Sequence, residues 1–193
     1  MDKASLDQIS DRDMRKTLYL SQGIIIGLSA LIVFINPGLL RDFPGWTKMN
    51  FPIFLLTCGT STGIAALQIL LDRWIPDQWT DDGGINVRMF QALSYFHIPI
   101  AMAVVAVAEE FLFRGLLQPM LGYPAASILF ALVHTRYLKK PLLLISALLL
   151  GFYLGALFLV FHSLAASILA HYTMNVLLGI VQKHHDEHSR KRL

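Results

Sequence analysis

The chain has 193 residues, of which 55% are hydrophobic and 15% are charged, and its formal net charge is +3. So few charges among so many apolar residues are typical of a membrane protein, and they exclude a soluble domain with an ordinary charged surface. No basic patch is interleaved with aromatic residues, so nucleic acid is not an expected partner. The only cysteine, Cys58, excludes an internal disulfide and a cysteine metal cluster.

The apolar residues come in blocks of about 20 residues, the length that an α-helix needs to cross a bilayer. Six membrane helices are predicted, with a short amphipathic helix on the membrane surface between the second and the third. No small-residue cleavage site follows the first block, so we expect this helix to be retained rather than removed as a signal peptide. In chain order the predicted helices are residues 18–35, 51–71, 85–95 (the surface helix), 96–117, 124–138, 141–161 and 163–182.

The basic residues predict the orientation of the bundle, because short cytoplasmic loops of membrane proteins are enriched in Lys and Arg. With six helices, only Arg41 and Lys48 of the 16 Lys and Arg residues fall on the side opposite to the termini, and Arg114 lies within a helix. Five or seven helices would destroy this asymmetry. We therefore predict an all-α fold, a polytopic membrane helix bundle of about six transmembrane helices with both termini cytoplasmic.

The chain divides by composition into three parts. Residues 1–95 contain an N-terminal tail, two transmembrane helices and an interfacial loop. Residues 96–182 form a four-helix core that carries the polar motifs described next, and we expect the catalytic chemistry there. Residues 183–193 form a charged cytoplasmic tail.

The predicted helix 96–117 contains two adjacent carboxylates, Glu109 and Glu110, and a guanidinium, Arg114, in an otherwise apolar run. One ionisable group at the centre of a membrane helix costs about 2.5–3.5 kcal/mol, so three of them indicate a function. Glu110 and Arg114 are four residues apart and can form a buried ion pair on one helix face. Glu109 is turned by about 100° from Glu110, so it can face a different neighbour.

Two other predicted helices each carry a histidine within an apolar run. Phe130 and His134 are four residues apart, as are His171 and Asn175, so each pair shares one helix face. At about 1.5 Å per residue, Glu109 and the two histidines lie within about one turn of the helix midpoints and can share a depth. A lone membrane histidine is more often a packing residue, but two of them beside a buried carboxylate pair favour a functional site.

The chemistry follows from what these residues can do. The chain has no G-x-S-x-G nucleophile elbow, no H-E-x-x-H zinc helix and no aspartic-protease pair. A carboxylate, two imidazoles and an amide can deprotonate a water molecule and stabilise an oxyanion, which favours hydrolysis of an acyl bond. Two other interpretations stay open. One is a non-catalytic membrane scaffold or immunity protein that keeps these residues for packing, and the other is a small proton-coupled transporter with a Glu–His relay.

Three motifs carry a family resemblance, namely Glu109-Glu110-x-x-x-Arg114, Phe130-x-x-x-His134 and His171-x-x-x-Asn175. In order, spacing and helix placement they resemble the motifs of the CPBP family, the CAAX-processing and bacteriocin-processing intramembrane endopeptidases, also called the ABI family. The resemblance covers residues 96–182, and the short chain is similar to small bacterial members. It implies an integral protein of a bacterial cytoplasmic membrane.

The resemblance also implies a role for each motif residue. Glu109 would be the general base and would act with His134 on the attacking water, and His171 and Asn175 would donate hydrogen bonds to the oxyanion. The residues that it implies as support for the site are Glu110, Arg114 and Phe130.

Only two predicted transmembrane helices precede the motifs, fewer than in the eukaryotic prenyl-protein proteases. The resemblance therefore implies a leader peptide or a membrane-protein segment as substrate, rather than a prenylated CAAX protein. The family has been described both as metalloproteases and as glutamate-dependent proteases. Glu109, His134 and His171 could ligate zinc, but the same atoms can act without metal, and we expect no cofactor. The expected partners are the substrate and the lipid bilayer, and the oligomeric state is left open.

Overall fold

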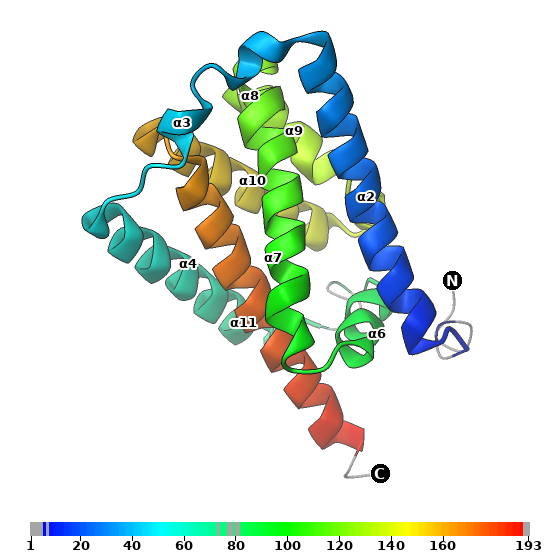
Figure 1. Cartoon of the computed structure of the whole chain (residues 1–193). Coiled ribbons are helices and arrows are strands. Elements are labelled where there is room, and N and C mark those ends of the chain that lie inside the picture. Colours follow the sequence, from blue (N-terminus) through cyan, green and yellow to red (C-terminus); the bar gives the residue numbers. More distant parts are fainter. Residues whose placement is uncertain (1–5, 7, 73, 77–78, 80–81, 191–193) are drawn as a thin grey trace.

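The structure is a computed structural model that describes residues 6, 8–72, 74–76, 79 and 82–190. Every regular element in these ranges is a helix, which confirms the predicted all-α fold (Figure 1). In chain order the elements are α2 (Asp11–Ile35), η1 (Pro37–Leu40), α3 (Phe43–Trp46), α4 (Phe51–Asp72), α6 (Ile85–Ala92), α7 (His97–Glu110), η2 (Phe111–Leu117), α8 (Gln118–Leu121), α9 (Tyr123–Leu132), η3 (Thr135–Lys139), α10 (Pro141–Phe161) and α11 (Leu164–Arg190).

Four helices, α2, α4, α10 and α11, are long and apolar enough to cross a membrane. Helices α4 and α10 agree with their predicted ranges to within one residue. Helix α2 begins seven residues earlier than predicted, because the Ser10 hydroxyl caps it by accepting a hydrogen bond of 3.1 Å from the backbone N–H of Asp13. Helix α11 continues to Arg190, so the described part of the predicted charged tail is helical.

The predicted helix 96–117 is a continuous helical run from His97 to Leu121, made of α7, η2 and α8. Its central part, η2, is a π-helix of seven residues, in which each turn holds more residues than an α-helical turn. π-Helices are rare and lie frequently at functional sites. Here η2 follows Glu110 directly and contains Arg114.

The predicted helix 124–138 is wrong at its C-terminal end, because α9 ends at Leu132 and His134 lies beyond it. The backbone N–H of His134 bonds to the Ala131 carbonyl rather than to the Phe130 carbonyl that an α-helix would use. The His134 side chain replaces the missing bond, with its Nδ1 2.7 Å from the Phe130 oxygen. His134 therefore caps the helix that was expected to contain it.

Both termini of the described bundle lie at the end where α6 is found, which we call the α6 end (Figure 1). Arg88 of α6 forms an ion pair of 2.7 Å with Asp11 at the start of α2. Gln91 of α6 donates a hydrogen bond of 2.8 Å to Asp186, close to the end of α11. The short helix α6 thus joins the beginning of the bundle to its end.

The opposite end, which we call the α3 end, is closed by Trp46. Its ring packs edge-on against Phe158 of α10 at 5.6 Å and lies in one buried cluster with Leu164, at the start of α11. The chain returns from there to the α6 end through α9 and η3, because the Tyr137 hydroxyl accepts a hydrogen bond of 3.0 Å from Asn86 of α6. Helix α2 begins at the α6 end of the bundle, and α11 ends there (Figure 1).

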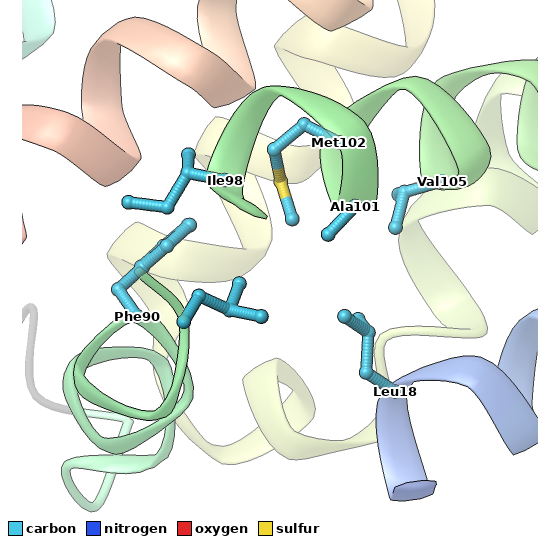
Figure 2. Close-up of a cluster of buried hydrophobic side chains, with 7 residues drawn as sticks. Leu18, Phe90, Ile98, Ala101, Met102 and Val105 are labelled. Carbon is cyan, nitrogen blue, oxygen red and sulfur yellow. The ribbon is translucent and has the colours of Figure 1, made fainter. Parts of the chain in front are cut away.

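A hydrophobic cluster fixes α6 to the bundle (Figure 2). Phe90 of α6 lies against Ile98 of α7, and Leu18 of α2 closes the other side of the cluster. Ile98 and Met102 are almost completely buried, whereas many other apolar side chains of the protein face outward. The short helix that was predicted at 85–95 is therefore present, but it ends earlier, at Ala92, and it is packed against the bundle.

Helices α9 and α10 approach closely at Gly151. A Cβ atom on Gly151 would lie 2.7 Å from the Ser127 carbonyl oxygen and 3.3 Å from the Phe130 ring. Small residues allow such close approach between membrane helices, and the buried carbonyl of Gly151 accepts hydrogen bonds from both Ser127 and Arg114. The contact at Gly151 therefore holds α9 next to η2, which contains Arg114.

We predict that Gly151→Ala destabilises the protein by about 1–3 kcal/mol, because the added methyl group must push the α9 backbone away. The matched control is Gly63→Ala in α4, where a Cβ atom would meet nothing within 4 Å. The midpoint of thermal unfolding in detergent measures both variants. Equal midpoints would contradict the close contact at Gly151.

Candidate active site

The site is built on a buried ion pair between Glu110 and Arg114. Arg114 Nε lies 3.1 Å from Glu110 Oε2, and Arg114 Nη1 donates to Glu110 Oε1 at 3.3 Å. The two side chains are 0% and 1% exposed, so the predicted pair is present and is withdrawn from both lipid and water. Two opposite charges at this distance reduce the cost that each would have alone in the bilayer.

Phe130 and the Gly151 carbonyl complete the surroundings of the guanidinium. Arg114 Nη2 donates a hydrogen bond of 2.9 Å to the Gly151 oxygen, and the guanidinium carbon lies 4.4 Å from the centre of the Phe130 ring. Phe113 packs edge-on against the same ring at 5.2 Å. A cation over an aromatic face gains further stabilisation when it is desolvated. Phe130 therefore supports the charge of Arg114 as well as filling space.

His171 of α11 lies between the two adjacent carboxylates. Its Nδ1 is 2.8 Å from Glu110 Oε1, and its Nε2 is 4.0 Å from Glu109 Oε2. A carboxylate accepts hydrogen bonds, so His171 Nδ1 carries a proton and donates a hydrogen bond to Glu110. This bond turns Nε2 toward Glu109. Such orientation of an imidazole by a second carboxylate is the geometry that active histidines use.

Glu109 is the more accessible of the two carboxylates, with 13% of its side chain exposed against none for Glu110. Its distance of 4.0 Å from His171 Nε2 is longer than a hydrogen bond. The two groups are thus adjacent without being bonded to each other. The prediction that Glu109 faces a different neighbour from Glu110 is only partly confirmed, because the two carboxylates contact the two nitrogens of one imidazole.

His134 reaches this group through Phe130. The centre of the Phe130 ring lies 5.1 Å from the centre of the His134 ring and 5.9 Å from that of the His171 ring, so Phe130 is next to both histidines. His134 is partly exposed, and its Nδ1 faces the Phe130 carbonyl. A carbonyl can only accept, so Nδ1 carries a proton, and in the neutral form of the imidazole Nε2 has the free lone pair.

Asn175 lies one turn after His171 on α11 and is partly exposed. In the described ranges, no hydrogen bond or ion pair joins Asn175 or His134 to Glu109 or His171. The structure thus brings Glu109 and His171 together and leaves His134 and Asn175 on the border of the site.

Sequence reasoning missed the bond between His171 and Glu110. The pairing of Glu110 with Arg114 had accounted for this carboxylate, but a carboxylate has two oxygens and can accept from two donors. This capacity to accept from a second donor is the feature that could have indicated the bond. The π-helix was also missed, and no feature of the sequence Phe111–Leu117 marks it.

A zinc site needs at least three protein ligands around one point, and Glu109, His134 and His171 are the predicted ligands. Among the described residues, no group of three or more His, Cys, Asp and Glu side chains is arranged to hold a metal ion. His171 Nδ1 and His134 Nδ1 face Glu110 and the Phe130 carbonyl. Glu109, His134 and His171 are therefore not arranged around one point, although Nε2 of each imidazole is left as the nitrogen that could bind a metal.

A helix bundle with carboxylate–imidazole contacts between its apolar helices defines a class, that of polytopic membrane proteins with a polar site inside the bundle. Comparisons with known proteins specify the class further. The family model described as type II CAAX prenyl endopeptidase Rce1-like matches residues 91–177. The protein YpbD of Bacillus subtilis (strain 168), described as uncharacterized, is 36% identical over 140 residues, which are 67% of this chain and 74% of YpbD. No solved structure matches the chain.

The chain therefore belongs to the Rce1-like, or CPBP, family of membrane endopeptidases, as its three motifs indicated. The matched residues run from the end of α6 to α11 and include every residue of the site described above.

We predict that Glu110→Gln destabilises the protein by about 3–5 kcal/mol, because it leaves the Arg114 charge buried without a counter-charge. The matched control is Glu109→Gln, which removes a carboxylate that is partly exposed, and it should change the stability far less. The double variant Glu110→Gln with Arg114→Met should recover most of the loss. Unfolding in detergent measures all three, and equal losses for the two single variants would contradict the assignment.

Proposed function

We propose that the protein hydrolyses a peptide bond in a membrane-associated or leader-peptide substrate, within the membrane and with water as nucleophile. The observation that carries this proposal is a row of four neighbouring side chains, Arg114, Glu110, His171 and Glu109. It supplies a buried ion pair, an imidazole oriented by that pair, and a partly exposed carboxylate beside Nε2 of the imidazole.

The charges of these four groups suggest the protonation state of the site. With Glu109 and Glu110 ionised and with Arg114 charged, the set is neutral if His171 carries a proton on both nitrogens. A neutral set is favoured in the low dielectric of a membrane interior. Doubly protonated His171 donates through Nδ1 to Glu110 and keeps its Nε2–H for the substrate. In this state it can donate a hydrogen bond to an oxyanion, the role that the family resemblance implied.

The proposed reaction begins when Glu109 accepts a proton from water while the water oxygen bonds to the carbonyl carbon of the scissile peptide. The π electrons of the carbonyl move to its oxygen, and His171 with Asn175 donates hydrogen bonds to the oxyanion. His134 shares in orienting the water through its free Nε2. The tetrahedral species collapses as the C–N bond breaks, and the proton held by Glu109 passes to the leaving nitrogen.

We also propose that the chain crosses the bilayer six times with both termini cytoplasmic, and that residues 96–182 form the catalytic core. Four helices have the required length and apolarity, and the run from His97 to Leu121 is equally long. Helix α9 is only about 15 Å long and needs η3 to complete the passage. Non-helical backbone at membrane depth is tolerated where protein or water surrounds it. The position of α6 at the end that carries both termini supports the orientation (Figure 1).

A relative in a bacterium supports the bacterial cytoplasmic membrane as the location that we propose. As the substrate we propose a leader peptide or a membrane-protein segment. The partners that we propose are this substrate and the bilayer, without a metal cofactor.

We predict that Glu109→Gln lowers cleavage by at least about 100-fold without changing the amount of protein in the membrane, because the amide cannot accept a proton from water. Mass spectrometry of membrane peptides from cells that carry either form identifies the substrate and measures the loss. Glu187→Gln on the outer part of α11 is the matched control. Normal processing by Glu109→Gln would support a non-catalytic scaffold instead.

The same cleavage measurement also tests the proposal on metal. Purified protein should cut the identified peptide equally well before and after exhaustive chelation, because the proposed proton transfers use only Glu and His. Complete loss of cleavage that zinc restores would overturn the metal-free reaction.

We predict that a membrane-impermeant maleimide added to intact cells labels Lys48→Cys but neither Gln8→Cys nor His188→Cys, each in a Cys58→Ala background. The three positions are exposed, Gln8 and Lys48 lie outside the long apolar helices, and His188 lies in the charged last part of α11. Labelling of either terminal position from outside would contradict the proposed orientation.

A further inference from the structure

The segment that carries His134 has an unusual position for a residue of an active site. His134 follows the end of α9 and precedes η3, and its backbone is not helical, with φ −78° and ψ 60°. An imidazole in such a linker rotates about two side-chain bonds unless its surroundings hold it. What holds His134 therefore decides whether its Nε2 can serve the reaction.

The ring of Tyr137 covers one face of the His134 imidazole. The two ring centres are 5.5 Å apart and the planes are nearly parallel, at 18°. The 3₁₀ geometry of η3 explains this contact, because side chains three residues apart are eclipsed in a 3₁₀-helix. The backbone N–H of Tyr137 also bonds to the His134 carbonyl at 2.8 Å. With Phe130 tilted by 52° against the same imidazole, two rings restrict its plane.

Tyr137 is in turn held by α6. Asn86 Nδ2 donates a hydrogen bond of 3.0 Å to the Tyr137 hydroxyl. Arg136 Nη2 donates at 3.5 Å to Asn86 Oδ1, and Arg136 Nη1 lies 3.4 Å from Asp82 Oδ2. The Asp82 carboxylate also accepts from the backbone N–H of Asn86 at 3.1 Å. These contacts orient the Asn86 amide with its NH₂ group toward Tyr137.

Helix α6 is itself a fixed support. Phe90 packs against Ile98 of α7 in the hydrophobic cluster of Figure 2. On another side, the Phe90 ring lies so close to Gly179 of α11 that a Cβ atom there would collide with it. Because α7 carries Glu109 and α11 carries His171, α6 connects the His134 segment to both of the helices that form the rest of the site.

We propose that Tyr137 and Asn86 are positioning residues for His134. Tyr137 holds the plane of the imidazole by stacking, and Asn86 holds Tyr137 through its hydroxyl. The resulting orientation keeps Nδ1–H on the Phe130 carbonyl and leaves Nε2 free for the substrate side of the site. This inference deepens the proposed function, since it gives His134 a defined tautomer that the reaction uses.

The test is a two-bond proton–nitrogen NMR spectrum of the protein in detergent micelles, with ¹⁵N-labelled histidine and with the His134 signal assigned by His134→Gln. The wild-type signal should show the Nδ1–H tautomer. In Tyr137→Leu it should become a mixture with the Nε2–H form, which free imidazole side chains prefer, because the stacking ring is lost. Tyr137→Phe keeps the ring but loses the hydroxyl that Asn86 holds, so it should give a partial mixture with less of the Nε2–H form than Tyr137→Leu.

The matched control is Tyr95→Leu, because Tyr95 also lies next to α6 and its hydroxyl donates a hydrogen bond to another element, at Glu187. Its His134 signal should stay as in the wild type. If Tyr137→Leu does not fold, Asn86→Ala carries the test, because it should give the same partial mixture as Tyr137→Phe. An unchanged His134 signal in a folded Tyr137→Leu or Asn86→Ala protein, or an equal change in Tyr95→Leu, would overturn the proposal.

Cleavage of the peptide identified with Glu109→Gln adds a second measurement. Tyr137→Leu should lower kcat by up to about 100-fold with an unchanged KM, since a misplaced catalytic group affects the chemical step rather than binding. If His134→Gln cleaves normally, the proposed role of His134 in the reaction fails. The NMR signal still decides whether Tyr137 and Asn86 position the ring, so the two failures can be told apart.

Discussion

The structure depends on keeping the Glu110 carboxylate charged inside an apolar bundle. A buried carboxylate without partners would be neutral or would destabilise the protein by several kcal/mol. Here Arg114, which follows in the same helical run, neutralises the carboxylate. His171 of α11 donates a hydrogen bond to it. Each partner requires a further element: Arg114 needs the Gly151 carbonyl of α10 and the Phe130 ring of α9. A single charge therefore specifies how four parts of the chain must meet.

That requirement separates the two glutamates by function as well as by position. Glu110 makes the internal contacts and is withdrawn from solvent, whereas Glu109 has no bonded partner among the described residues and remains partly exposed. His171 connects them, with one nitrogen toward each. A stable structure and a reactive carboxylate are thus obtained from adjacent residues, because the cost of burial is met at one position and the accessible oxygen is kept at the next.

The sequence was sufficient for the long elements and for the local pairs. Apolar blocks of membrane length predicted α4 and α10, and the spacing of four residues predicted the pair between Glu110 and Arg114. The end of α9 could not be predicted, because no Gly or Pro marks Leu132 and the stop depends on the His134 side chain replacing a backbone bond. The second donor to Glu110 was equally hidden, since it comes from a helix 61 residues away.

The π-helix between Glu110 and Gln118 has a consequence for how this segment can change length. Its turns hold more residues than α-helical turns, so a one-residue deletion there can be absorbed by a return to α geometry without a break in the helix. Side chains beyond the deletion would keep nearly the same orientation relative to Glu110, because the narrower α turn covers about the same rotation with one residue fewer. Homologous chains that differ by one residue in this stretch can therefore keep both flanking helix faces, and they are best aligned by helix face rather than by position.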